Sequence, residues 1–409
     1  MTAAHSFRVI SLAAGFLLAS APAGRAEPRW VPSWSASPAP SPAAAVLQNV
    51  TVREIVHTTA GGRRARLRLS NEYGTAPLRI DAVSLALREA GARIRPGSSV
   101  RVTFQGEGAV TVAPGAYVLS DPVAFKVPAQ SDLAVSLYVA GPASTTTAHG
   151  LQRDAVYFAP GDATEAAAIT PAAPPATGPA WLWLDQLEVA DSDAQGAVVA
   201  FGDSITDGAG PAPGTNAAWP DVLYARLRAA GLKRFSVANA GISGNRLLHP
   251  GGWPPFGGAG LARFDRDVLA QPNMRAVILL IGINDIGHVG AGVGPEQYVS
   301  AQDIAHGLAQ LAERAHARGL KVYAGTLLPF KPAAIPGYYT DAKEAERQAV
   351  NAWIRQAEVF DGVADFDHAL EDPAHPGQLR PLYDSGDHLH PSAAGHRAIA
   401  EAVPLDWFR

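Results

Sequence analysis

The chain has 409 residues, of which 47% are apolar and 17% are charged, and its net charge is −4. At about 100–200 residues per domain, this length predicts two or three domains with packed cores and excludes disorder along the whole chain. The absence of cysteine excludes disulfides, thiol catalysis and cysteine-bound metal centres. No run of basic residues is present, so the charge pattern of nucleic-acid binding is missing.

The first 26 residues have the pattern of a signal peptide. Arg8 precedes an apolar stretch over residues 9–19, and the small residues Gly24 and Ala26 stand just before a cleavage site at Glu27. The alternative is a buried N-terminal helix. The apolar stretch is too short to span a bilayer. We therefore expect a secreted or periplasmic protein that has no membrane insertion after cleavage and a net charge of −6.

Residues 27–190 have the alternating pattern of a β-rich accessory domain. Ala65, Leu67 and Leu69 alternate with three arginines, which predicts a half-buried strand with its arginines in water. The same alternation recurs further along, and turn signals separate the segments. Several short strands at this spacing favour an antiparallel β-sandwich. A Pro/Ala-rich stretch at 171–180 is typical of a linker or an exposed loop.

Residues 191–409 change to alternating strands and helices. Apolar runs without alternation predict parallel strands that are buried on both faces. These runs are residues 197–201, 235–240, 276–281, 321–328 and 363–366. Helical spacing between them predicts helices near 219–227, 304–311, 341–357 and 392–402. The order predicts a doubly wound α/β domain, which binds ligands at the carboxyl ends of its strands.

The first three of these strands are each followed by a residue that could serve a catalytic site. Ser204 follows the first strand, Gly241 the second and Asn284 the third. Each has an ordinary alternative, because serine and asparagine cap helices and glycine permits tight turns. Because the carboxyl ends of parallel strands meet at one sheet edge, the three together favour a site there.

A loop near the C-terminus carries Asp387 and His390, three residues apart. Such a carboxylate can accept a hydrogen bond from one ring nitrogen and direct the other nitrogen toward a nucleophile. The alternatives are a helix cap at Asp387 or a plain salt bridge. A further alternative is zinc bound by His388 and His390, with Asp384 or Asp387 as third ligand. We expect no metal and no cofactor.

Four sequence blocks resemble those of the SGNH (GDSL-type) hydrolase superfamily, in the same order and each at the end of a predicted strand or in the C-terminal loop. They are Gly202-Asp203-Ser204, Gly241, Gly282-x-Asn284-Asp285 and Asp387-x-x-His390. The resemblance covers about residues 197–405 and implies a flavodoxin-like three-layer fold with a parallel sheet. The preceding β-rich residues resemble an accessory domain of secreted bacterial members.

The resemblance implies a role for each block. Ser204 would be the nucleophile, His390 its general base and Asp387 the residue that orients the ring. The backbone N–H groups of Ser204 and Gly241 and the side-chain amide of Asn284 would form the oxyanion hole. A serine hydroxyl needs such a base, and each oxyanion donor contributes about 10²–10³ in rate. We expect an esterase rather than a protease.

Asn245, Trp253 and Phe256 are candidate substrate-binding residues, in and just before a stretch rich in glycine and aromatic residues. The alternative for this stretch is an ordinary surface loop. We predict a serine esterase that removes small, acetyl-type groups from a carbohydrate or another small-molecule or polysaccharide ester. The alternatives are a lipase or broad arylesterase with the same triad, and a non-catalytic carbohydrate-binding protein. The oligomeric state stays open.

Overall fold

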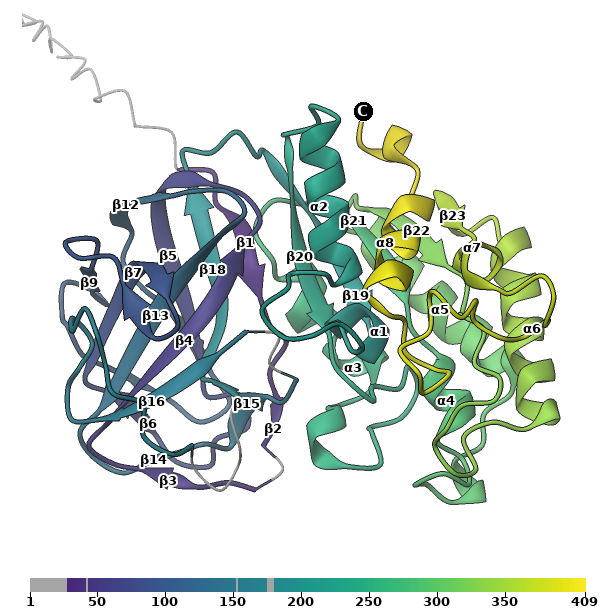
Figure 1. The fold of residues 1–409 in the computed structure, drawn as a ribbon, viewed down its shortest axis with the longest axis horizontal. Coiled ribbons are helices and arrows are strands. Elements are labelled where there is room, and N and C mark those ends of the chain that lie inside the picture. The colour runs from purple at the N-terminus through teal and green to yellow at the C-terminus, as the bar shows by residue number, and fades with distance from the viewer. Residues whose placement is uncertain (1–27, 42, 152–153, 175–179) are drawn as a thin grey trace, which may run out of the picture.

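The computed structural model describes residues 28–41, 43–151, 154–174 and 180–409. The predicted signal peptide and residues 175–179 of the predicted linker lie outside these ranges. The described residues form a β region (β1 to β18) and an α/β region (β19 to the C-terminus), which lie side by side (Figure 1). No helix among the described residues is long and apolar enough to cross a membrane.

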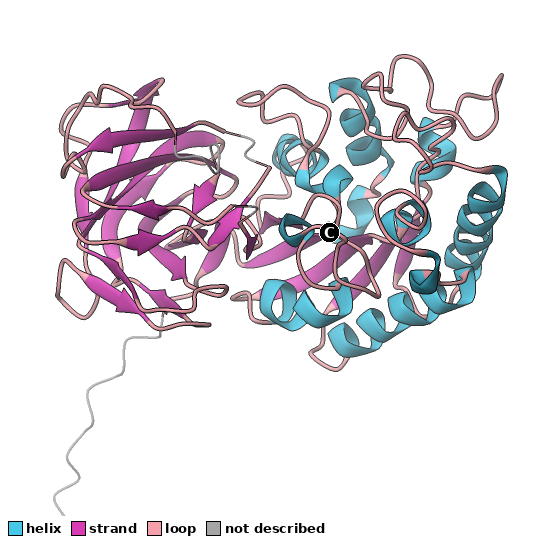
Figure 2. Ribbon diagram, turned by 90° about the horizontal axis from the view of Figure 1, so that it is seen from below, coloured by secondary structure: helices cyan, strands magenta, loops and turns pink. Residues whose placement is uncertain are grey.

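Two antiparallel sheets form most of the β region (Figure 2). The first contains, in order, β1 (Val31–Ser35), β18 (Leu184–Ala190), β5 (Gly62–Ser70) and β11 (Tyr117–Leu119), with β12 (Val123–Val127) also beside β5. The second contains β16 (Val156–Pro160), β4 (Val50–Thr58), β13 (Ser131–Val139), β7 (Ala82–Ala90) and β8 (Arg93–Ile94), with β9 (Val100–Val102) beside β7. These sheets confirm the prediction of an antiparallel β-rich region.

Short strands complete the β region. A three-stranded sheet contains β17 (Trp181–Leu182), β15 (Thr147–His149) and β2 (Ala39–Pro40). Two further pairs are β3 (Val46–Leu47) with β14 (Ala143–Ser144), and β6 (Leu78–Ile80) with β10 (Val110–Val112).

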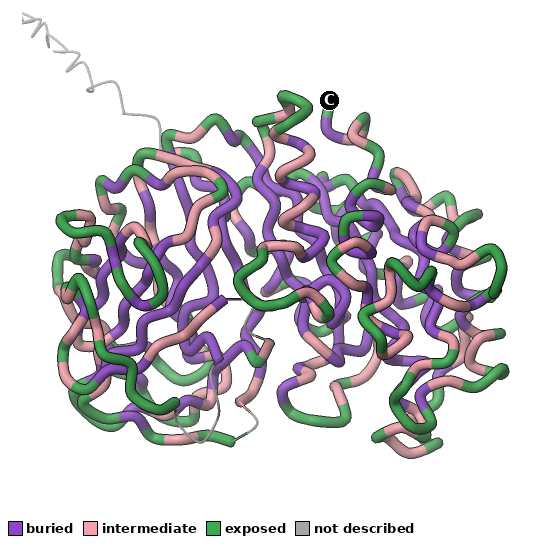
Figure 3. The backbone as a smooth tube through the Cα atoms, viewed as in Figure 1, coloured by how far each residue is buried: buried purple, intermediate pink, exposed green. Residues whose placement is uncertain are grey.

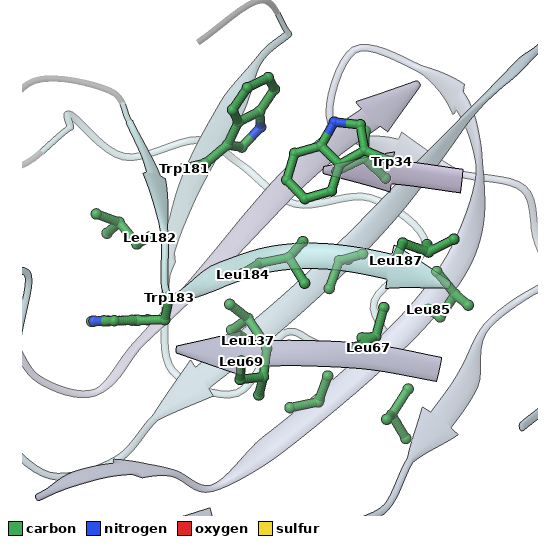
Figure 4. Close-up of a cluster of buried hydrophobic side chains, with 14 of the residues drawn as sticks. Trp34, Leu67, Leu69, Leu85, Leu137, Trp181, Leu182, Trp183, Leu184 and Leu187 are labelled. Atoms are coloured by element: carbon green, nitrogen blue, oxygen red, sulfur yellow. The ribbon is translucent and has the colours of Figure 1, made fainter. Parts of the chain in front are cut away.

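Apolar side chains from both large sheets share one core (Figure 4). Leu67 and Leu69 of β5 and Leu137 of β13 are fully buried in it. The rings of Trp34 and Trp181 meet edge to face, with 5.1 Å between their centroids. The alternation of apolar residues therefore identified the inward faces of the strands correctly.

The arginines of β5 do not all face water, which corrects the prediction for this strand. Arg68 is only 5% exposed, and its Nε lies 2.7 Å from Asp185 Oδ1. Arg66 pairs in the same way with Glu188 of β18, at 2.6 Å. Because β18 runs beside β5, it places acids opposite these arginines. A strand so distant in the sequence cannot be recognised from the alternation of β5 alone.

The α/β region is built on a parallel sheet, as predicted. Its strands, in spatial order, are β20 (Phe235–Gly241), β19 (Gly196–Gly202), β21 (Met274–Leu280), β22 (Lys321–Gly325) and β23 (Gly362–Ala364). This is the 2-1-3-4-5 order of doubly wound sheets. The three strands β20, β19 and β21 are buried along almost their whole length (Figure 3).

Helices cover both faces of this sheet (Figure 2). Val199 and Phe201 of β19 pack in one apolar cluster with Leu308, whereas Val198 and Ala200 pack in another. Both faces of β19 are therefore buried against apolar side chains, which explains the apolar run at 197–201. The helices are α1 (Ser204–Asp207), α2 (Trp219–Ala229), α3 (Gly260–Phe264), α4 (Ile283–Gly287), α5 (Ala301–His316), α6 (Asp341–Gln356), α7 (Phe366–Leu370) and α8 (Ala393–Ala402). Short 3-10 helices are η1 (Pro254–Phe256), η3 (Pro295–Gln297) and η4 (Leu405–Phe408), and η2 (Asp265–Leu269) is a short π-helix.

The β region packs against the edge of the parallel sheet, where β1 lies next to β20 (Figure 1). Buried polar groups join the two regions there. Ser35 Oγ donates to the carbonyl of Asn239 at 2.8 Å, and Thr59 Oγ1 donates to that of Val237 at 3.1 Å. The two regions therefore share a specific interface.

Candidate active site

Ser204 lies at the start of α1, directly after β19. Asp203 caps this helix, because its Oδ1 accepts the N–H of Ile205 at 3.0 Å. A Cβ at Gly202 would lie 2.4 Å from the carbonyl oxygen of Leu280, so only glycine fits at this strand end. The N–H of Ser204 is in the first turn, where a helix has no acceptor of its own.

His390 connects Ser204 to Asp387. Its Nε2 lies 2.9 Å from Ser204 Oγ, and its Nδ1 lies 2.6 Å from Asp387 Oδ2. Burial raises the pKa of Asp387, but hydrogen bonds from the ring and backbone N–H of His390 outweigh it and hold this pKa below its ordinary range. The carboxylate is therefore ionised at neutral pH, and it fixes the tautomer that carries the proton on Nδ1, so that Nε2 accepts from the serine hydroxyl.

The neighbouring His388 contacts a different acid, because its Nδ1 bonds to Asp384. The two histidines of the His-x-His pair are thus held by separate carboxylates. Among the described residues, no group of three histidine, aspartate or glutamate side chains could hold a metal ion. The structure therefore adds no support to the zinc alternative.

The side-chain amide of Asn284, near the start of α4, is held from both ends. Its Nδ2 donates to the carbonyl of Asn245 at 2.9 Å, and its Oδ1 accepts from the hydroxyl of Tyr338 at 2.7 Å. One N–H of the amide is left to bind a ligand. The sequence analysis missed Tyr338, which is fully buried and lies in a loop with no periodic pattern.

Gly241 does not have a free backbone N–H, which corrects its predicted part in the oxyanion hole. That N–H donates to Asn239 Oδ1 at 2.8 Å. A Cβ at this position would lie 2.2 Å from the backbone nitrogen of Asp207, so the glycine allows β20 to approach α1. Within the described part of the chain, the buried N–H of Gly244 has no acceptor.

Asn245 does not face a ligand, and the prediction that it binds substrate is wrong. Its side chain is fully buried, and its Nδ2 donates to the carbonyls of Phe256 and Gly258, both at 2.7 Å. Its Oδ1 accepts from Arg263 Nε at 2.9 Å. Asn245 therefore holds the loop that carries the other two candidates. In that loop Trp253 is 51% exposed, and its ring meets Phe256 edge to face.

Arg263 of α3 joins the strand ends beneath the site. Its Nη2 donates to the carbonyl of Gly202 at 2.7 Å, and its Nη1 donates to that of Ala240 at 2.8 Å. Asp267, one helical turn away, accepts from it at 2.9 Å. Burial lowers the pKa of Arg263, and Asp267 counteracts this. The four-residue spacing indicates the ion pair, but nothing in the sequence places it under the strands.

Comparisons with known proteins identify the family of the α/β region. Residues 200–398 match the model of the GDSL-like Lipase/Acylhydrolase family. A mutant acetyl xylan esterase from Geobacillus stearothermophilus has 25% sequence identity and a TM-score of 0.39, with 51% of this chain and 93% of that chain covered. A lipase/acylhydrolase from Enterococcus faecalis has 21% identity and a TM-score of 0.40, with 51% and 92% covered. No curated protein matches the chain. Residues 200–398 form a domain of the GDSL-like lipase/acylhydrolase family, and the protein is a carboxylic ester hydrolase.

Proposed function

We propose that the protein is a serine esterase that hydrolyses small, acetyl-type esters through Ser204, His390 and Asp387. The observation that supports this most strongly is the unbroken hydrogen-bond series from Ser204 Oγ through both nitrogens of His390 to Asp387. The series has the geometry that an activated serine requires.

In this mechanism, His390 Nε2 takes the hydroxyl proton as Ser204 Oγ attacks the ester carbonyl. The imidazolium that forms is stabilised by the ionised Asp387 and then protonates the leaving alkoxide. The products of this stage are the free alcohol and an acyl-enzyme on Ser204. A water molecule, deprotonated by His390, then attacks the acyl group; the acid leaves, and the proton held by His390 returns to Ser204 Oγ.

The oxyanion hole that we propose contains the N–H of Ser204, the free N–H of Asn284 Nδ2 and the N–H of Gly244. Gly244 replaces Gly241 because its N–H is buried without an acceptor among the described residues. Asn284 donates its other amide hydrogen to the carbonyl of Asn245, the residue after Gly244, so the two donors lie close together.

We propose that the enzyme is exported and that its substrate is an acetylated carbohydrate or a similar polar ester. The test is hydrolysis of p-nitrophenyl esters from C2 to C12, and of acetylated xylan, by the wild type and Ser204→Ala. We expect activity that depends on Ser204 and is highest at C2–C4, and a loss of about 10⁴-fold or more in kcat in the variant. A maximum at C8 or longer would favour the lipase alternative. Activity that survives in Ser204→Ala would contradict the triad.

We further propose a signal peptide at residues 1–26, an accessory domain at 27–190 and a three-layer hydrolase domain at 191–409. The last boundary is supported by the change from β18, which ends at Ala190 in an antiparallel sheet, to β19, which begins at Gly196 in the parallel sheet. Sequencing the N-terminus of the exported protein tests the first boundary. Glu27 as the first residue supports cleavage, whereas an intact Met1 contradicts it.

A further inference from the structure

A cavity of about 330 Å³ lies between the β region and the α/β region. We call it the inter-region pocket. Its lining residues come from both regions, and they are His149, Gly150, Leu151 and Ala180 of the β region and Asp207, Ile242, Ser243, Trp253, Pro255 and Phe256 of the α/β region. This volume is at the lower end of the range for sites that bind small molecules.

The wall from the α/β region is next to the proposed oxyanion hole. A Cβ at Gly244 would lie 2.3 Å from the ring of Phe256, so this ring covers the glycine. Phe256 also stacks on His288, which in turn meets Tyr338, the residue that holds Asn284. Phe256, which lines the pocket, is thus connected to Asn284 through a series of packed rings.

The floor of the pocket is connected to the nucleophile. Asp207 is the last residue of α1, one turn after Ser204. Its Oδ2 accepts from both the N–H and the Oγ of Ser243, at 3.0 and 2.8 Å. Ser243 immediately precedes Gly244, so the floor and the proposed oxyanion donors belong to the same short segments.

The wall from the β region is fixed in place by a buried pair. His149 Nε2 lies 2.9 Å from Asp207 Oδ1, and His149 Nδ1 lies 2.8 Å from the carbonyl oxygen of Ser37. The next residue, Gly150, approaches the opposite wall at Pro255. The β region therefore faces the helix of the nucleophile through a specific contact rather than a loose one.

The chemistry of the lining is mainly apolar. The polar side chains of His149, Asp207 and Ser243 bond to one another or to backbone groups. The remaining side chains are aliphatic or aromatic, and the half-exposed Trp253 stands among them. An acetyl group alone needs little of this space.

We propose that the inter-region pocket binds a bulky apolar group of the ester, and that the β region thereby supplies part of the substrate site. This rests on the proposed function, because the pocket is useful to catalysis only if Ser204 is the nucleophile. Because the acyl group of the proposed substrate is small, the apolar group belongs to the alcohol of the ester.

The test uses the full chain and two ratios of kcat/KM: 2-naphthyl acetate to ethyl acetate for the alcohol, and p-nitrophenyl octanoate to p-nitrophenyl acetate for the acyl chain. Leu151→Glu places a charge on the wall from the β region, and Leu151→Ala is a milder variant that leaves a small side chain. The matched control is Leu119→Glu, at a leucine of the β region that is 41% exposed and does not line the pocket.

We expect Leu151→Glu to lower the ratio of 2-naphthyl acetate to ethyl acetate about tenfold or more, mainly through KM, and Leu151→Ala to lower it less. A fall in the octanoate ratio instead would place the acyl chain in the pocket and would contradict both this assignment and the preference for acetyl groups. Both ratios unchanged, with Leu119→Glu equal to wild type, would overturn the proposal while leaving the triad intact.

A failure of the proposed function is distinguishable from a failure of the pocket. If the proposed function fails, hydrolysis is not lost in Ser204→Ala, or it is absent in the wild type. Calorimetric binding of 2-naphthol then decides on the pocket alone. Binding to the wild type that Leu151→Ala weakens supports an apolar site, and binding that is absent or equal in both proteins contradicts it.

Discussion

Buried arginines serve different purposes in the two regions of the molecule. In the β region, Arg68 of β5 forms an ion pair with Asp185 of the neighbouring antiparallel strand β18. In the α/β region, Arg263 donates to carbonyls at the ends of β19 and β20. The same guanidinium chemistry thus holds a sheet together in one region and positions the edge of the active site in the other.

The two arginines show that a buried polar group does not by itself indicate function. What indicates function is the position of such a group relative to the carboxyl ends of the parallel strands. Groups near that edge, such as Asn284 and Tyr338, are expected to affect turnover, whereas Arg68 is expected to affect only stability.

Arg68→Ala should lower the free energy of unfolding by about 3–5 kcal/mol, because it leaves Asp185 buried without its partner. Denaturant titration measures this, and kcat at a temperature where the variant is folded should equal that of the wild type. The control is Arg79→Ala, whose exposed pair with Asp81 should contribute less than about 1 kcal/mol. A fall in kcat for folded Arg68→Ala would break the division between the two regions.

Asp203→Asn should remove a pH dependence of stability. Burial raises the pKa of Asp203 to about 7, so the folded state keeps a proton that the unfolded state loses near pH 4. In the wild type this group lowers stability as the pH rises from about 4 to 7, by up to about 4 kcal/mol.

Unfolding at several pH values measures the difference between the two proteins. Asp191→Asn is the control, since the pKa of this exposed acid is lowered by Arg64 and its effect falls below that pH window. Identical pH profiles for wild type and Asp203→Asn would contradict the prediction.

Asn284→Ala should lower kcat about 10²-fold with little change in KM, because an oxyanion donor acts mainly in the transition state. Steady-state kinetics with p-nitrophenyl acetate measure both constants. A change in KM alone would show that Asn284 binds the substrate, and it would remove this residue from the proposed oxyanion hole.

Tyr338→Phe should lower kcat about tenfold, because the amide of Asn284 loses the hydroxyl that holds its Oδ1. The adjacent Tyr339→Phe is the matched control, since that hydroxyl bonds to Asp341 at the surface. A merely structural effect of Tyr338→Phe would lower the melting temperature and leave kcat unchanged. That outcome would contradict its positioning role.

The sequence predicted the α/β fold well because its signals are local. Apolar runs marked the parallel strands, and glycine or polar residues marked their ends. The run at 321–328 is longer than the strand, which ends at Gly325. Beyond it, the N–H of Leu327 turns to Asn351 Oδ1 instead of a neighbouring strand, and apolar character alone cannot show this.

Features that depend on distant partners could not be predicted. The Gly241 N–H donates to Asn239, and Asn245 is buried under its loop. Both features depend on side-chain directions in three dimensions. Asp185 lies 117 positions after Arg68, so the pairing of β5 with β18 left no local pattern. The inter-region pocket likewise depends on how the surfaces of the two regions meet.

The most direct test of the proposed triad is labelling with a fluorophosphonate probe, followed by mass spectrometry of the peptides. Such a probe reacts with a serine whose hydroxyl is activated by a neighbouring base. We expect one adduct, on Ser204, which disappears in His390→Ala. No adduct on Ser204, or labelling that is unchanged in His390→Ala, would contradict the proposed triad.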